Sequence, residues 1–213
     1  MKRRRFVITA GPTREHLDPV RFLSNPSTGK MGFAIARAAA ETGCDVTLVA
    51  GPVALKTPKG VKRVDVVSAR EMLAAVEAAV AGDDEVTVIG VAAVADWRPA
   101  RCAAQKLKKT QMDGTLRLVR NPDILKTLNL HRRPGLTLVG FAAETNDLER
   151  EAARKCREKG LEFIVANDVT APGAGFGTDT NRVVFLRKDG SVERLPLMSK
   201  LAVARRIVRS LTD

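Results

Sequence analysis

The chain has 213 residues, 45% hydrophobic and 28% charged, a balance that suits a globular protein with a sizeable core. No apolar run approaches the roughly 20 residues that a transmembrane helix needs, and the basic residues 2–5 lead into a strand-like segment rather than a signal-peptide core. We therefore predict a soluble, cytoplasmic protein without a membrane partner, whose net charge of +12 attracts anionic ligands.

The first part of the chain alternates strands and helices. Its predicted elements are a strand at 6–10, a helix at 29–41, and strands at 45–50 and 63–67. Ser68 and Glu71 have the spacing of a capping box, and apolar residues then repeat at period 3.6 up to Val80, which predicts a helix. Segment 86–93 is a continuous apolar run, typical of a strand covered on both faces.

The second half continues this alternation, with a charged helix at about 147–159 and a last helix that begins after Ser199 and ends at Leu211. Further strands are predicted at 136–141, 162–166, 182–186 and 192–195, the last two joined by a hairpin turn at 188–190. This order predicts an α/β fold: a doubly wound, mainly parallel, Rossmann-like sheet with a small flap or hairpin extension. We expect a single domain over residues 1–213, with the flap at about 100–120 and the C-terminal hairpin and helix at about 181–211.

Three predicted strands end in loops rich in small and polar residues, which begin at Gly11, Ala95 and Ala142. Ligands of doubly wound sheets bind at the carboxyl ends of the strands, so these loops are expected to converge on one site. Gly11 is the only glycine where a dinucleotide fingerprint requires three, which weakens the case for a hydride-transferring enzyme.

Residues 19–32 form a polar segment that leads directly into a helical pattern. Ser27 or Thr28 is predicted to cap the helix that begins near Gly29, leaving backbone N–H groups to face a phosphate. Arg21 and Asn25, just upstream, add a fixed cation and an amide. An ordinary cap beside a solvated Lys30 is the alternative.

Two groups of lysines are further candidates for phosphate binding. Residues 106–109, a polar turn and residues 116–119 predict a strand pair outside the main sheet, from which a lysine could reach over a triphosphate or simply discourage aggregation. Lys155 and Lys159 share one helix face, where they could meet a phosphate tail or remain an exposed basic surface.

Nothing in the sequence indicates a protein-based metal site. The cysteines are odd in number, widely separated and in no Cys-x-x-Cys pair, and neither histidine has a second ligand at suitable spacing. The basic residues are spread along the chain, and seven Phe and one Trp offer little stacking surface, so nucleic acid is not the expected partner.

Taken in order, these segments resemble bacterial phosphopantothenoylcysteine synthetase. The matching motifs are Gly11-Pro-Thr-Arg-Glu, Asp18-Pro-Val-Arg-Phe, Ser24-Asn25 with Gly29-Lys-Met-Gly, Ala92-Ala-Val-Ala-Asp96, Lys106-Leu-Lys-Lys109, Asn121-Pro-Asp-Ile124, Gly140-Phe-Ala-Ala-Glu-Thr145 and Ala166-Asn-Asp168. The resemblance implies the coenzyme A pathway step that joins 4′-phosphopantothenate to L-cysteine with CTP and Mg²⁺. An acyl-cytidylate forms with loss of pyrophosphate, and the cysteine amine then displaces CMP.

The resemblance also implies roles for individual residues. Lys106 would activate the first step, Asn25 would donate a hydrogen bond to the tetrahedral centre of the second, and Arg21 belongs to the same half-reaction. The implied nucleotide-binding residues are Gly11, Gly90, Val91, Ala92, Asp96, Lys106, Pro122, Asp123, Ile124, Leu125, Phe141, Lys155 and Lys159. The implied phosphopantothenate-binding residues are Arg21, Asn25, Ser27, Thr28, Gly29 and Lys30.

Phosphate oxygens and water are expected to hold the Mg²⁺, so no protein ligand is named. A homodimer with the flap near the partner subunit is expected from the family, and the preference for CTP over ATP rests on the resemblance alone.

The chain departs from the family pattern in two places. Many relatives carry a flavin-dependent decarboxylase domain before the first strand, whereas this chain starts at that strand, so no FMN binding is expected. Pro26-Ser27-Thr28 stands where relatives usually have a longer polar residue and two serines, but Thr28 keeps a hydroxyl and phosphate binding should survive.

Two other functions remain as alternatives. A nucleotide-binding oxidoreductase would bind NAD(P) and need no CTP. A non-catalytic nucleic-acid-binding module, supported by net charge alone, would lose affinity steeply with salt.

Overall fold

The computed structural model describes residues 4–82, 84–108, 110, 114–144, 147–168, 173, 175 and 177–212. Lys109 and Thr145, which belong to two of the family-like motifs, lie outside the described residues, as do the side chains of Glu144 and Asp168. None of the described helices is long and apolar enough to cross a bilayer.

The centre of the fold is an eight-stranded sheet in the order β13-β12-β10-β9-β6-β1-β4-β5. Its parallel strands are β5 (Val61–Asp65), β4 (Asp45–Ala50), β1 (Arg5–Ala10), β6 (Val86–Gly90), β9 (Leu136–Glu144) and β10 (Phe163–Asp168). The hairpin of β12 (Val183–Arg187) and β13 (Val192–Arg194) adds an antiparallel edge. The predicted doubly wound, mainly parallel fold is confirmed.

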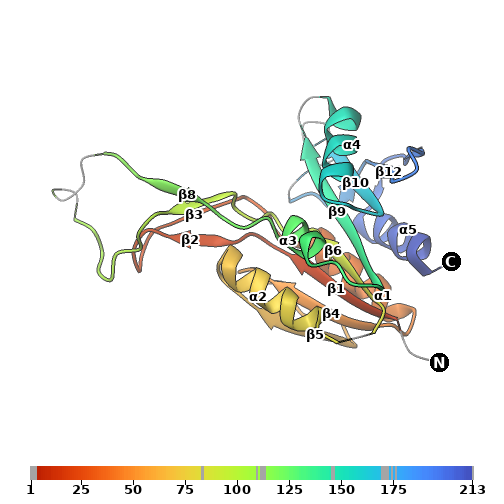
Figure 1. The fold of residues 1–213 in the computed structure, drawn as a ribbon, viewed down its shortest axis with the longest axis horizontal. Helices are drawn as coiled ribbons and strands as arrows, with labels where there is room; N and C mark the ends of the chain where they lie inside the picture. Colours follow the sequence, from red (N-terminus) through yellow and green to blue (C-terminus); the bar gives the residue numbers. More distant parts are fainter. Residues whose placement is uncertain are drawn as a thin grey trace.

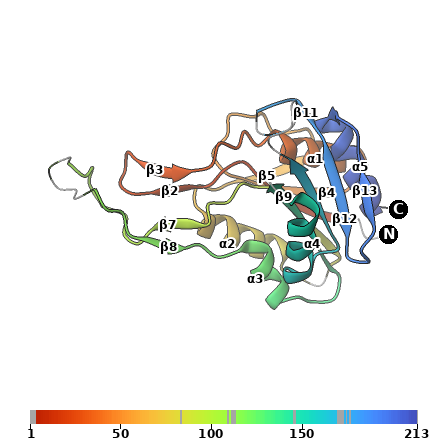
Figure 2. The same cartoon turned by 90° about the horizontal axis from the view of Figure 1, so that it is seen from above.

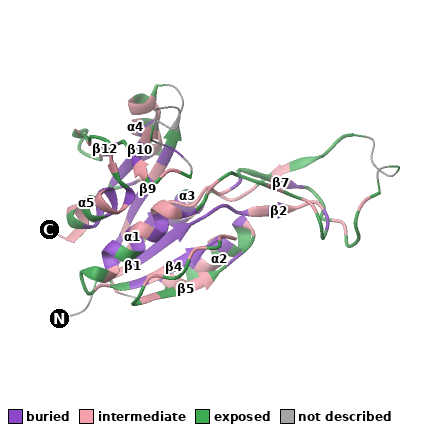
Figure 3. Ribbon diagram, turned by 180° about the vertical axis from the view of Figure 1, so that it is seen from behind, coloured by how far each residue is buried: buried purple, intermediate pink, exposed green. Residues whose placement is uncertain are grey.

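Helices cover both faces of this sheet (Figures 1 and 2). Helices α1 (Lys30–Glu41) and α5 (Lys200–Thr212) pack on one face, and α2 (Ala69–Val80), α3 (Ile124–Leu130) and α4 (Leu148–Glu158) pack on the other. The central strands are accordingly buried along their length (Figure 3). Burial on both faces explains why β1 and β6 read as continuous apolar runs.

The strand order reverses between β1 and β6, because β1 leads outward to β4 and β5 while the later strands add on the other side. Ala10 and Gly90 end these two neighbouring strands at the same edge of the sheet. Such a reversal leaves a crevice at the carboxyl ends of the strands, which is where doubly wound sheets bind ligands.

Helix α1 approaches β1 closely because glycines stand at its N-cap, Gly29, and in its first turn, Gly32. A Cβ at Gly32 would lie 2.5 Å from Ala10 Cβ and 3.0 Å from the Thr9 carbonyl oxygen. Gly29 has φ +77°, a left-handed conformation that favours glycine, and a Cβ there would lie 3.4 Å from the Gly11 amide nitrogen. The N-terminus of α1 therefore sits directly beside the end of β1.

The predicted start of α2 is confirmed in detail. Ser68 Oγ accepts a hydrogen bond from the Glu71 amide at 3.2 Å, and Glu71 Oε2 accepts one from the Val67 amide at 2.8 Å. Ser199 caps α5 in the same way, since its Oγ accepts from the Ala202 amide at 3.2 Å. A small ladder of β11 (Thr180–Asn181) and β14 (Met198–Ser199) leads into that helix.

An arm projects from the carboxyl edge of the sheet (Figures 1 and 2). It consists of two antiparallel ladders, β2 (Arg14–His16) with β3 (Phe22–Ser24) and β7 (Trp97–Pro99) with β8 (Leu118–Arg120). The strand pair predicted for residues 106–109 and 116–119 is therefore wrong in its placement. Leu107 is instead bound through its backbone to Asp18 and Arg21, which takes it away from a ladder.

Other predicted strand ends are displaced by a few residues, again by contacts from distant segments. The strand predicted at 63–67 is β5 at Val61–Asp65, because the Val67 carbonyl accepts from the Arg14 amide at 2.8 Å instead of joining the sheet. The run 86–93 ends as a strand at Gly90, because the next two amides bond to Thr9. Strand β9 extends past its predicted end at Phe141 because it pairs with β10 through Glu144.

We expect Gly32→Ala to lower the free energy of unfolding by about 1–3 kcal/mol, because the added methyl group would clash with β1. The better helix propensity of alanine offsets at most about 1 kcal/mol of this loss. Urea unfolding followed by circular dichroism measures the change. A variant as stable as the wild type would contradict the close packing of α1 on β1.

Candidate functional site

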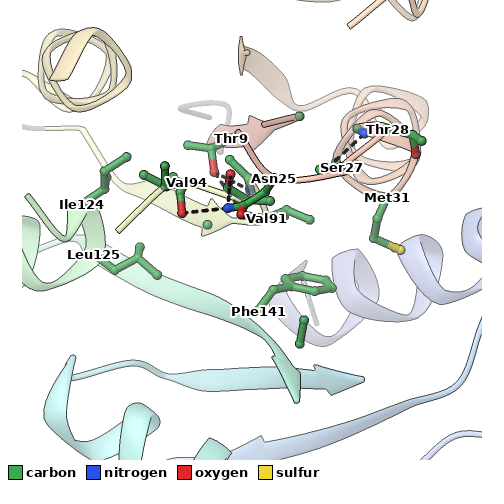
Figure 4. A pocket seen from close by; sticks show the side chains of 18 of the residues that line it. Thr9, Asn25, Ser27, Thr28, Met31, Val91, Val94, Ile124, Leu125 and Phe141 are labelled. Atoms are coloured by element: carbon green, nitrogen blue, oxygen red, sulfur yellow. Dashed lines mark hydrogen bonds between the residues drawn. The ribbon is translucent and has the colours of Figure 1, made fainter. Parts of the chain in front are cut away.

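A cavity of about 430 Å³ opens at the reversal of strand order, between the ends of β1 and β6 and the N-terminus of α1 (Figure 4). The sequence-predicted residues that line it are Gly11, Asn25, Ser27, Thr28, Gly29, Lys30, Gly90, Val91, Ala92, Asp96, Pro122, Asp123, Ile124, Leu125, Phe141 and Lys159. Segments separated by more than a hundred residues thus share one cavity, as the convergence of strand-end loops predicts.

Two threonines of the first strand and loop hold the opposite wall in place. Thr9 Oγ1 accepts hydrogen bonds from the amides of Val91 and Ala92, both at 3.1 Å. Thr13 Oγ1, fully buried, accepts one from the Ala95 amide at 3.0 Å. The loop after β6 is therefore fixed against β1 before any ligand binds.

Asn25 lies against that same loop (Figure 4). Its Nδ2 donates to the carbonyl oxygens of Ala93 at 3.1 Å and Val94 at 3.3 Å. Both amide hydrogens are therefore engaged, and Asn25 must give up one of these contacts to donate to a substrate.

The expected side-chain cap of α1 is not present. Gly29 is the N-cap residue, and neither Ser27 nor Thr28 caps the helix. Ser27 Oγ instead accepts from the Gly29 amide at 3.4 Å, ahead of the first turn. The left-handed turn at Gly29 explains why neither hydroxyl caps the helix. The N-terminus of α1 therefore faces the cavity without a side-chain cap.

The far side of the cavity combines an apolar slot with an ion pair. Asp123 is the N-cap of α3, where its Oδ1 accepts from the Lys126 amide at 3.1 Å. Its Oδ2 pairs with Lys159 Nζ at 2.9 Å. Buried Ile124 and Leu125, with half-buried Phe141, form the adjoining apolar surface.

Three candidates lie elsewhere. The described residues that line the cavity do not include Arg21, Lys106 or Lys155. The exposed Lys106 belongs to the segment that joins β7 to β8 along the arm (Figure 2). Lys155 is on the same helix as Lys159 but one turn earlier, so only Lys159 reaches the cavity.

Arg21 is instead part of a clamp on the arm. Its Nε and Nη2 donate to the buried Asp18 Oδ2 at 3.0 and 2.6 Å, and Nη2 also donates to the Leu107 carbonyl at 2.9 Å. Asp18 Oδ2 in turn accepts from the Leu107 amide at 3.2 Å. Both backbone groups of Leu107 are held, so the clamp fixes the chain next to Lys106.

The clamp also changes the titration of Asp18. The hydrogen bonds from the Arg21 side chain, and then those from the backbone, hold the pKa of the Asp18 carboxyl well below its usual range despite burial. The ionised form is thus the one that the folded arm requires.

Sequence reasoning missed five polar residues that also line the cavity, namely Thr9, Asn121, Asn167, Asn181 and Lys200. Asn167 stands in a family-like motif and Thr9 in a predicted strand, but nothing local marks Lys200 as more than the start of a helix.

No group of three or more His, Cys, Asp or Glu side chains that could hold a metal ion occurs among the described residues. Asp96 and Asp123 are the described carboxylates that line the cavity, and Asp123 is already held by its cap and ion pair. A cation brought by a phosphorylated ligand would therefore find one carboxylate, Asp96, at this site.

The family described as "DNA/pantothenate metabolism flavoprotein C-terminal domain" matches residues 1–213, the whole chain. The chain belongs to this family.

Similar proteins are found among both known sequences and solved structures. The chain is 50% identical over 206 residues to the coenzyme A biosynthesis bifunctional protein CoaBC of Bacillus subtilis, covering 96% of this chain and 50% of that protein. It is 48% identical over 216 residues to the protein of the same name from Escherichia coli, covering 98% and 53%. It thus spans about half the length of these relatives. The crystal structure of the C-terminal domain of a CoaBC protein is similar with a TM-score of 0.82 and 47% identity, covering 99% of this chain and 96% of that one.

The lowered pKa of Asp18 predicts how an Asp18→Asn variant will respond to pH. Because the folded-state pKa is depressed, the ionised carboxylate stabilises the fold above its ordinary pKa of about 4, and this contribution is lost as the pH falls below that value. Asp18→Asn should therefore be less stable than the wild type at pH 7, with a smaller difference at pH 3. Urea unfolding at both values measures this. Asp65→Asn, at an exposed carboxylate that pairs with Arg63, is the control, and a pH-independent difference for Asp18→Asn would contradict the assignment.

Proposed function

We propose that this chain ligates 4′-phosphopantothenate to L-cysteine with CTP, giving 4′-phosphopantothenoylcysteine, CMP and pyrophosphate in coenzyme A biosynthesis. The observation that supports it best is that residues from six of the eight family-like motifs line one cavity at the reversal of strand order. The similarity to CoaBC proteins over almost the whole chain points to the same pathway.

In the first step, a carboxylate oxygen of phosphopantothenate forms a bond to the α-phosphorus of CTP, and the bond to pyrophosphate breaks. Both reactants are anions, so the step needs cations on both sides of them. The uncapped end of α1 with Lys30 supplies positive charge on one side of the cavity, and Lys159 supplies it on the other. Lys106 of the arm is proposed to complete the set.

In the second step, the cysteine amine attacks the acyl carbon, the C–O bond to CMP breaks, and the nitrogen loses a proton to solvent. A negative charge develops on the carbonyl oxygen of the tetrahedral centre. Asn25 is proposed to stabilise this oxygen by releasing its longer contact, the 3.3 Å one to Val94.

Mg²⁺ is proposed to enter with the nucleotide, bound mainly by phosphate oxygens and water, and when bound it would neutralise phosphate charge. Asp96 is the cavity carboxylate that could supply one protein oxygen. The reaction contains no step for FMN.

We further propose that the enzyme is a homodimer in which Lys106 serves the cavity of the partner subunit. The arm carries several exposed apolar side chains, a pattern typical of a surface covered by another subunit. They are Val20, Phe22, Trp97, Leu116 and Leu118, with relative exposures of 57, 39, 45, 38 and 39%. An arm that projects from its own sheet is well placed to reach a second copy (Figure 1).

We propose a cytoplasmic location. Cys44, Cys102 and Cys156 are free among the described residues, which is typical of a reducing compartment.

The two half-reactions should respond differently to substitution. Lys106→Gln should abolish pyrophosphate release from CTP, because the activating cation is lost, whereas Lys108→Gln on the same segment should retain it. Asn25→Asp should still form the acyl-cytidylate but turn it over about 10²- to 10³-fold more slowly. Pyrophosphate release and product formation are measured with CTP, phosphopantothenate and cysteine. The same assay with ATP in place of CTP serves as a comparison. Equal loss of both steps in both variants would contradict this division, and no release by the wild type would refute the function.

Mixing the Lys106→Gln and Asn25→Asp chains tests whether one active site uses residues of both subunits. If Lys106 serves the partner subunit, a hybrid dimer of Lys106→Gln and Asn25→Asp chains contains one intact site. Randomly assorted dimers should then recover about a quarter of the wild-type rate, because half of them are hybrids with one working site of two. If Lys106 serves its own cavity, every site carries a substitution and no activity returns.

A further inference from the structure

Lys200 is a buried lysine that lines the cavity from the first turn of α5, with 7% of its surface exposed. Its Nζ donates hydrogen bonds to the carbonyl oxygens of Gly175 at 3.1 Å and Thr178 at 2.6 Å. It forms no ion pair with any described carboxylate within 4 Å. A buried ammonium group is normally paired with an anion, whereas Lys200 Nζ donates only to neutral carbonyl groups among the described residues.

The carbonyl groups that Lys200 binds belong to a glycine-rich segment, residues 173–179, of which 173, 175 and 177–179 are described. Lys30 approaches this segment from the first turn of α1. Its Nζ donates to the Gly177 carbonyl at 2.9 Å and pairs with Asp179 Oδ1 at 2.7 Å. The Asp179 side chain is 88% exposed and faces solvent more than the cavity. Among the described side chains, one exposed carboxylate balances these two ammonium groups and two helix N-termini, which leaves this end of the cavity positive.

Each lysine retains the capacity to bind one more acceptor. An ammonium group has three N–H donors, and each of these two uses two of them on the described residues. The carbonyl contacts hold both groups at fixed positions on the glycine-rich segment. An anion in the cavity could accept a hydrogen bond from each without displacing that segment.

The electrostatics around Lys200 favour binding of an anion. Burial lowers the pKa of Lys200, and the charge of Lys30 lowers it further, whereas Asp179 acts in the opposite direction. Lys30 in turn lowers the pKa of Asp179. A bound anion would relieve the repulsion between the two lysines.

We propose that Lys200 and Lys30 together form a phosphate subsite at the α5 end of the cavity, with Lys200 as a substrate-positioning residue. The proposal rests on the proposed function, which offers two sources of this group: the triphosphate of the nucleotide and the 4′-phosphate of phosphopantothenate. A purely structural Lys200 would only tie the glycine-rich segment to α5.

Neutral and charged substitutions distinguish these roles. Lys200→Gln keeps amide donors for the two carbonyls but removes the charge, Lys200→Arg keeps the charge, and Lys56→Met removes a lysine outside this cavity. Isothermal titration calorimetry with CTP, with phosphopantothenate and with inorganic pyrophosphate measures binding to each folded variant. Lys200→Gln should weaken one of the two substrates at least about tenfold and the other less than about twofold. Lys200→Arg should restore most of the loss, and Lys56→Met should bind as the wild type does.

The ligand that weakens identifies the source of the phosphate. Loss of CTP and pyrophosphate affinity assigns the triphosphate, and loss of phosphopantothenate affinity assigns the 4′-phosphate. Unchanged binding of all three ligands, or equal weakening of all with a lower melting temperature, would overturn the proposal. The same holds if Lys56→Met weakens binding as much as Lys200→Gln.

Asp179→Asn gives an independent test at an exposed residue that does not threaten folding. Removing this carboxylate should strengthen binding of the same ligand, because it makes the subsite more positive, and unchanged or weaker binding would overturn the subsite. If the wild type binds phosphate ligands through Lys200 but releases no pyrophosphate in the complete assay, the proposed function fails while the subsite stands.

Discussion

The close contact between α1 and β1 determines where this protein can bind a ligand. Gly32 leaves no side chain between the helix and Ala10, and Gly29 turns the chain so that the helix begins beside Gly11. The helix N-terminus and the crevice at the strand reversal therefore coincide. Larger residues at the two α1 glycines would separate these features, and neither alone would make an anion site.

Electrostatics at the cavity depends on which cations are already paired. Arg21 is held by Asp18 in the arm, and Lys159 is held by Asp123 at the cavity wall. Lys30 pairs with the exposed Asp179, whereas Lys200 is anchored by carbonyl groups among the described residues, so the charge of Lys200 is less completely compensated. Most of the +12 net charge is spread over the chain, and only the lysines gathered at the cavity can act on one ligand.

The predicted elements agree with the structure where periodicity reflects burial between layers, as in β1, β4 and α2. They disagree where a single hydrogen bond from elsewhere ends a strand. Val67 leaves the sheet for Arg14, and Leu107 is taken from a ladder by Asp18. No local pattern encodes these contacts, because their partners are more than fifty residues away.

The sequence alone determined the α/β class and the order of the motifs, and it placed those motifs at strand ends, because apolar periodicity and turn residues act locally. Tertiary structure alone decided which polar residues share the cavity. It brought in Lys200 and Asn181 and directed Arg21 away. The physical reason is that strand order sets which loops meet, and competition among charged partners sets which side chains remain available there.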